Sequence, residues 1–95
     1  MNKYEILYIL NASLSDEEIT AQTEKYAEIV TKNGGEVEKI DKWGVKRFTY
    51  PINFKNEGFY VLMTFTASPE LPKEIERQMG ISDAVYRFMT TRAAN

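Results

Sequence analysis

The residue types that most often carry chemistry in proteins are scarce in this sequence. It contains no cysteine and no histidine, so it lacks thiol chemistry, disulfides, the commonest general base and the commonest metal ligand. Asp16, Glu17 and Glu18 form a contiguous run without the alternating, glycine-containing spacing of a calcium loop. No glycine-rich phosphate motif or nucleophile elbow is present. The sequence therefore predicts no catalytic residues, no metal site and no cofactor.

Charged side chains are instead separated along the chain. Residues 15–38 hold seven acids against two lysines, whereas the stretch from 42 to 56 lacks acids and holds Lys42, Lys46, Arg47 and Lys55. Lys3, Arg87 and Arg92 lie outside the acidic stretch as well. This separation favours an anionic ligand, but so few cations, in a chain of formal net charge −2, would bind it weakly. We expect a partner that supplies more positive charge.

The cationic stretch has the pattern of an edge strand. One side of its period-two alternation carries the apolar residues Phe48, Tyr50 and Ile52. Gly44 interrupts the alternation and predicts a bulge or bend beside Trp43, the single tryptophan. Residues 36–43 form the first half of the strand, and Val37 and Ile40 are out of strict phase there, which predicts a further bulge. Pro51 cannot donate a ladder hydrogen bond, which places the strand at a sheet edge. The cations discourage pairing with the wrong chain.

The sequence predicts two helices. Ser15 and Glu18 form a capping box for a helix that runs to about Asn33 and stops at Gly34 and Gly35. A second helix is expected to open with Ser68 as cap and Pro69 at the first position, and to end at Gly80. Its buried line is expected to be Leu71, Ile75 and Met79.

Three further strands are predicted, over residues 3–10, 59–67 and 84–92, and the phase of the last one is ambiguous. Residues 53–58 have the composition of a hairpin turn, with Phe54 and Lys55 near its tip. An exposed aromatic beside a lysine suits contact with a nucleic acid, and it is equally compatible with packing and solubility.

The element order is strand, helix, strand, strand, helix, strand, which predicts an α+β protein with the ferredoxin-like split β-α-β arrangement. Right-handed crossovers place the first and third strands in the centre of a four-stranded antiparallel sheet, with two helices on one face. The other face stays open. An open apolar strip flanked by charge is typical of an interaction surface, and here it would display Leu7, Ile9, Tyr60 and Leu62.

The 95 residues are enough for a single domain that spans residues 1–95. No apolar run approaches the roughly 20 residues of a membrane span, and no signal-peptide pattern is present. We therefore expect a cytoplasmic protein with no membrane partner.

Several motifs together resemble one known family. They are Lys3-Tyr4-Glu5, residues 33–39, Trp43-Gly44 followed by Lys46-Arg47, residues 50–53, residues 57–63, Ile81-Ser82-Asp83, and Arg87-Phe88-Met89. In register over nearly the whole chain, they resemble the S-six family, the sixth protein of the bacterial small ribosomal subunit. Two departures are visible. The chain stops at Asn95 where many members carry a charged extension, and Thr90 and Thr91 stand where aliphatic residues are usual.

The resemblance implies a ferredoxin-like fold and a ribosomal location. It implies a structural role, binding small-subunit ribosomal RNA as a heterodimer with ribosomal protein S-eighteen to assemble and stabilise the central domain. It also implies a partner-binding set along the second strand, namely Asp41, Lys42, Trp43, Lys46 and Arg47. The RNA contacts it implies are Lys3, Lys55, Tyr60 and Arg87. The distribution of cations adds Arg92 to this predicted RNA-binding set.

Two alternatives use the same architecture. A sheet-mediated homodimer that senses a small molecule is compatible with the apolar strip. An acylphosphatase-like enzyme would need a cation or a glycine-rich cradle after the first strand, and residues 11–15 offer neither.

Overall fold

Six elements follow one another in the predicted order. The computed structural model describes the backbone of residues 1–52 and 55–93, and the side chains of residues 1–48 and 56–93. The elements are β1 (Asn2–Asn11), α1 (Asp16–Lys32), β2 (Glu36–Ile52), β3 (Lys55–Ala67), α2 (Leu71–Gly80) and β4 (Val85–Arg92). The ferredoxin-like α+β prediction is confirmed.

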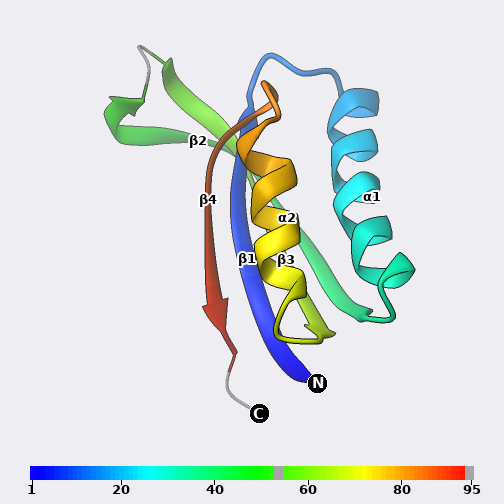
Figure 1. Cartoon of the computed structure of the whole chain (residues 1–95). Helices are drawn as coiled ribbons and strands as arrows, with labels where there is room; N and C mark the ends of the chain where they lie inside the picture. Colours follow the sequence, from blue (N-terminus) through cyan, green and yellow to red (C-terminus); the bar gives the residue numbers. More distant parts are fainter. Residues whose placement is uncertain (53–54, 94–95) are drawn as a thin grey trace.

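The four strands form one antiparallel sheet in the order β2-β3-β1-β4. β1 and β3 are therefore central, and β2 and β4 are the edges, as predicted. Both helices lie on the same face of the sheet (Figure 1). Over the described residues, the other face of the sheet is thus left without a covering helix.

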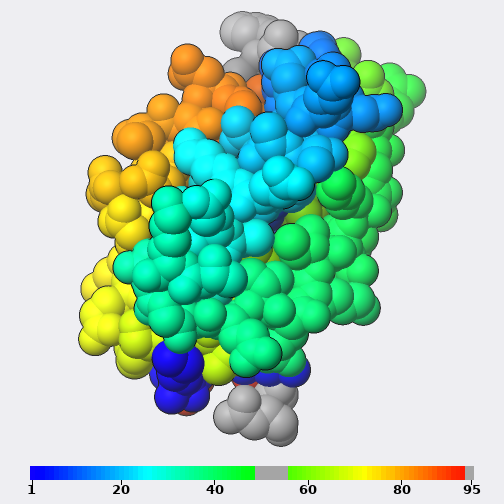
Figure 2. Space-filling view, turned by 90° about the vertical axis from the view of Figure 1, so that its right-hand side faces the viewer, coloured from blue at the N-terminus to red at the C-terminus, as the bar shows by residue number. Residues whose placement is uncertain are grey.

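The core lies between the sheet and the helices. Alternate residues of the central strands are buried against α1 and α2, and they are Ile6, Tyr8, Leu10, Val61, Met63, Phe65 and Ala67. The helices contribute a buried stripe each, and the stripe of α2 consists of Leu71, Ile75 and Met79 as predicted, with Pro72 beside it. On the side of the molecule shown in Figure 2, α1 fills the space between α2 and β2.

Local sequence signals fix both ends of α1. The Glu18 backbone N–H donates to Ser15 Oγ (3.2 Å) and the Ser15 N–H donates to Glu18 Oε1 (3.1 Å), which is the predicted capping box. The hydrogen bond from the Ser15 backbone N–H to the carboxylate, followed by that from the Ser15 side chain, lowers the pKa of Glu18. At the other end Gly34 takes φ = 80°, and the Gly35 N–H donates to the Val30 carbonyl (2.9 Å). This is the expected glycine stop.

The predicted start of α2 is wrong by two residues. The N-cap is Glu70, whose side chain makes no capping hydrogen bond, and the helix begins at Leu71 with Pro72 in its first turn. The Leu71 N–H donates to the Ser68 carbonyl (3.1 Å), so Ser68 and Pro69 belong to a tight turn that precedes the helix. The helix also includes Gly80, and its C-cap is Ile81.

Both predicted irregularities of β2 are present. The register shifts between Val37 and Lys39 and again between Lys42 and Gly44, where Gly44 takes φ = 87°. The hairpin turn is shorter than predicted, since β2 continues to Ile52 and β3 starts at Lys55. The predicted aromatic of the turn, Phe54, lies outside the described residues, as does the side chain of Lys55.

Candidate nucleic-acid and partner interface

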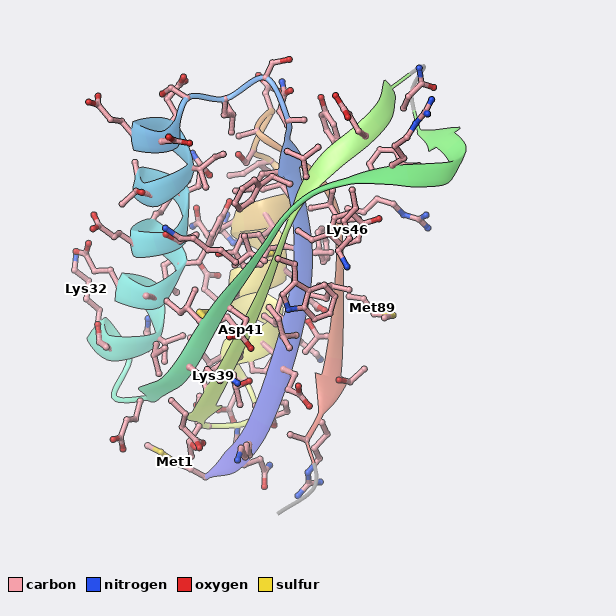
Figure 3. The ribbon with its side chains drawn as sticks, turned by 180° about the vertical axis from the view of Figure 1, so that it is seen from behind. Met1, Lys32, Lys39, Asp41, Lys46 and Met89 are labelled. Atoms are coloured by element: carbon pink, nitrogen blue, oxygen red, sulfur yellow. The ribbon has the colours of Figure 1, made fainter. Side chains whose placement is uncertain are left out.

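The uncovered face of the sheet presents one side of all four strands. Leu7 stands between Leu62 and Met89, and Ile9 stands between Tyr60 and Arg87. On the β2 side, Asp41 pairs with Leu62. Since directly paired residues point to the same side of a sheet, these side chains share one surface, which we call the open face. Figure 3 shows the molecule from behind, so that the open face is turned toward the viewer, with α2 beyond the strands and Asp41, Lys46 and Met89 labelled on the near side.

An aromatic cluster covers the open face where β2 meets β3. The rings of Trp43 and Tyr60 are nearly parallel, with centroids 6.4 Å apart, and the ring of Phe48 lies 6.3 Å from Tyr60. Lys46 Nζ lies 5.1 Å from the Trp43 ring centroid, within cation–π range. Trp43 is nevertheless 45% exposed. The cluster offers a partly exposed aromatic surface beside a positive charge.

The burial of Ile9 corrects the expectation that this residue is displayed on the apolar strip of the open face. Leu7, Tyr60 and Leu62 are half-buried on the open face, but Ile9 is only 8% exposed. Gly58 explains the difference, because a Cβ at this position would overlap Ile9 Cγ2 and come within 2.8 Å of Phe48 Cζ. Ile9 and Phe48 therefore both pack onto the space left by the missing side chain. The predicted apolar strip is narrower than the sequence indicates.

Ion pairs partly neutralise the cations at the end of the open face near the chain termini. Lys3 Nζ lies 3.2 Å from Glu38 Oε1, and Thr66 Oγ1 donates to Glu38 Oε2 (2.7 Å). The hydrogen bond from Thr66, followed by that from Lys3, lowers the pKa of Glu38. Lys39 Nζ pairs in the same way with Asp41 Oδ2 (3.2 Å). Lys3 is thus available to an anion only in competition with Glu38.

The two arginines of β4 lie on opposite faces. Arg87 pairs with Ile9, is exposed on the open face, and makes no ion pair or side-chain hydrogen bond with any described residue. Arg92 pairs with Tyr4, whose ring packs against the core, so it points to the helix side. Its Nη2 donates to Asn2 Oδ1 (2.8 Å). The structure does not bring Arg92 together with Arg87 and Tyr60.

The predicted partner-binding residues are also divided between the two sides of β2. Asp41 pairs with Leu62, Trp43 stacks on Tyr60, and Lys46 lies over the Trp43 ring. These three side chains therefore belong to the open face. Lys42 pairs with the core residue Val61, and Arg47 pairs with Glu57, so both point to the other side. Along its described length β2 pairs with β3 alone, which leaves its outer rim of backbone groups unpaired.

The loop after β1 lacks the geometry of a phosphate cradle. The Ser13 N–H donates to Asn11 Oδ1 (2.9 Å) and the Leu14 N–H to the Asn11 carbonyl (3.2 Å). The Ser15 N–H is used by the capping box of α1. The amides of Ser13, Leu14 and Ser15 are therefore already occupied by Asn11 and Glu18 and do not point freely at an anion.

The described part of the chain lacks a metal-binding cluster and a membrane-spanning helix. No group of three or more carboxylates lies close enough together to hold a metal ion. Neither of the two helices is long and apolar enough to cross a membrane.

Sequence reasoning missed a depression between β1 and β4. Its lining consists of Leu7, Ile9, Arg87, Phe88 and Met89, and its volume is about 330 Å³. Met89 is 60% exposed and is the most exposed apolar side chain among the described residues that line the depression. The ambiguous phase of the last strand hid this residue, because the phase decides whether Met89 or Thr90 points outward.

Comparisons with known proteins agree with this fold. A family described as "Ribosomal protein S6" matches residues 3–92. Small ribosomal subunit protein bS6 of Clostridium novyi is 51% identical over 89 residues, which cover 94% of each chain. The bS6 protein of Desulfitobacterium hafniense is 48% identical over 92 residues, which cover 97% of each chain.

The solved structures give the same result. The crystal structure of 30S ribosomal protein S6 from Thermotoga maritima superimposes with a TM-score of 0.91 at 25% sequence identity, covering 97% of this chain and 87% of that one. The chain therefore belongs to the ribosomal protein S6 family, and it is a structural component of the small ribosomal subunit and not an enzyme.

Proposed function

We propose that this protein binds small-subunit ribosomal RNA together with ribosomal protein S-eighteen, as a heterodimer, and that it thereby assembles and stabilises the central domain of the subunit. The family places the chain in the small subunit. What we propose beyond this location is that the chain binds the ribosomal RNA and S-eighteen.

The observation that carries the proposal is the open face together with the singly paired rim of β2. Exposed apolar and aromatic side chains beside cations are typical of an interaction surface, and Trp43, Lys46 and Met89 provide them here. A rim with unpaired backbone groups offers hydrogen bonds to a protein partner as well. One surface can thus serve two neighbours in a ribonucleoprotein.

The division of β2 side chains supports a protein partner at this rim. Asp41, Trp43 and Lys46 lie on one side of the strand, and Lys42 and Arg47 lie on the other. A partner that grips the edge would contact both sides at once. We assign the S-eighteen contact to this rim.

The proposed RNA contacts use the remaining cations and Tyr60. Lys3, Tyr60 and Arg87 lie on the open face. Lys55, whose side chain lies outside the described residues, follows the hairpin turn, and Arg92 would act from the helix side of β4. Four cations release few counterions from RNA, so we expect weak binding alone and tight binding with the partner.

The test is reconstitution of the protein with S-eighteen and a central-domain fragment of the ribosomal RNA over a salt series. The fluorescence of Trp43 should change when S-eighteen docks, since this single tryptophan lies at the proposed contact. This protein and S-eighteen together should bind the RNA more tightly than either protein binds it alone. RNA binding that is equally tight without S-eighteen would contradict the proposal.

A charge reversal tests the RNA side. Arg87→Glu should weaken RNA binding by about tenfold or more at physiological salt, because it removes an attraction and adds a repulsion. Lys73→Glu is the matched control, since Lys73 is exposed on α2, on the helix side of the sheet. Equal effects of both substitutions would show only a general dependence on net charge.

The partly exposed apolar residues of the open face also leave the sensing homodimer as a second candidate. Light scattering on the isolated protein separates the two. A stable dimer would favour the sensor, and a monomer the ribosomal scaffold.

A further inference from the structure

We propose that the depression between β1 and β4 holds one unpaired RNA nucleotide, with its base on Leu7, Ile9 and Met89 and its phosphate on Arg87. The inference rests on the proposed RNA binding and adds the class of nucleotide and the contact surface.

The floor of the depression is mainly apolar. Leu7 and Met89 are paired across β1 and β4, and Ile9 and Arg87 form the next pair on the same face. Phe88 pairs with the core residue Tyr8, and it lies between Arg87 and Met89 in the lining of the depression. Packing holds Ile9 in place, since it is only 8% exposed, whereas Met89 is 60% exposed and can adjust to a ligand. The volume of about 330 Å³ is at the small end of ligand sites.

The charge of the depression favours an anion. No acid among the described residues contributes to its lining, and β4 carries two arginines and no acid. On the same face, Lys3 and Lys39 are engaged by Glu38 and Asp41. Arg87 makes no such pair with a described residue, so a phosphate can bind its guanidinium without breaking an ion pair.

The apolar floor favours an unpaired nucleotide over a duplex. A duplex presents phosphates and riboses at its surface and hides the faces of its bases, so it would cover Leu7 and Met89 without an apolar contact in return. An unpaired base can be turned outward and laid on the floor while the neighbouring phosphate reaches Arg87. The rival occupant is an acidic protein segment with an apolar anchor.

The experiment uses the protein with S-eighteen and a central-domain RNA fragment that carries photoreactive 4-thiouridine. The variants are Arg87→Gln and Met89→Ala. Ile81→Ala is the control, because Ile81 is an exposed apolar residue (70%) that does not line the depression. Circular dichroism checks that each variant is folded.

The two contacts predict different signatures. Met89→Ala should weaken RNA binding by about threefold to tenfold and leave the salt slope unchanged, since it removes an apolar contact. Arg87→Gln should lower the salt slope by about 0.7, because it removes one phosphate contact to an unpaired strand. Ile81→Ala should change neither quantity. Crosslinks to peptides of β1 and β4 should come from nucleotides that chemical probing shows to be unpaired.

Three results would overturn the inference. The first is RNA binding with crosslinks to β1 and β4 only from base-paired nucleotides, or with no such crosslinks. The second is a Met89→Ala variant that binds RNA normally but binds S-eighteen less well without RNA, which would identify the protein occupant. The third is a wild-type complex that binds no RNA, and this result alone would also remove the proposed function.

Discussion

The neighbouring threonines of β4 allow a sharp test of the strand register. Thr90 pairs with Ile6 on the core side, and its Oγ1 is buried without a hydrogen-bond partner among the described residues. Thr91 pairs with Glu5 on the open face and is exposed. A buried hydroxyl without a partner costs about 1–3 kcal/mol, and valine has nearly the same shape without that group. Thr90→Val should therefore stabilise the protein.

We expect Thr90→Val to raise the free energy of unfolding by about 1–2 kcal/mol, and the melting temperature by about 4–8 °C for each kcal/mol. Thr91→Val should stay within about 0.5 kcal/mol of the parent, as surface substitutions do. Urea unfolding followed by circular dichroism and by the fluorescence of Trp43 measures both values. The denaturant slope should be unchanged in each variant.

The pair of variants also controls for strand propensity, because both replace threonine with valine in the same strand. An equal gain at Thr91 would show that propensity, and not the buried hydroxyl, is responsible. No gain at Thr90, or a loss of stability, would refute the assigned register and the unpaired state of its hydroxyl.

Three further predictions concern other elements. Replacing Lys46 and Arg47 of β2 with valine should promote self-association and disturb S-eighteen docking, because it removes charge from a free strand edge. A variant that stays monomeric in light scattering and binds S-eighteen normally would exclude this edge as the docking site. Hydrogen bonds from Arg77 and then Gln78 hold the pKa of Glu74 at about 2. This lowered pKa stabilises the fold above the ordinary value of 4.5, and the effect is lost as the pH falls towards 2. The stability difference from Glu74→Gln should therefore shrink over that window, and a pH-independent difference in urea unfolding would contradict the ion pair. Gly35→Ala should destabilise by about 1–3 kcal/mol, since a Cβ there would lie 2.8 Å from a main-chain oxygen of β3, and a neutral result in the same assay would contradict the tight contact.

Sequence reasoning succeeded where the signal is local. Ser15 and Glu18 are three residues apart, and their reciprocal hydrogen bonds follow from that spacing. Gly44 marked the bulge of β2 because it adopts a positive φ that other residues avoid. The start of α2 was misplaced because Ser68 and Pro69 are equally suited to a turn and to a helix cap.

The candidate site was less predictable, since its residues come together from distant parts of the chain. The ion pair of Lys3 with Glu38 joins β1 to β2 and limits one predicted RNA contact. Phe48 and Gly58 together hide Ile9, although Ile9 belongs to the apolar strip in the sequence pattern. No spacing within a single segment encodes either contact.

The sequence by itself determined the element order, the central position of β1 and β3, the edge position of β2 and the ends of α1. Each depends on side-chain periodicity or on backbone preferences within a few residues. Only the tertiary structure decided that Arg87 and Met89 face outward while Thr90 and Arg92 face the helix side. The side-chain period of a strand is two, so a shift of one residue exchanges its faces, and the pairing of β4 with β1 fixes that choice.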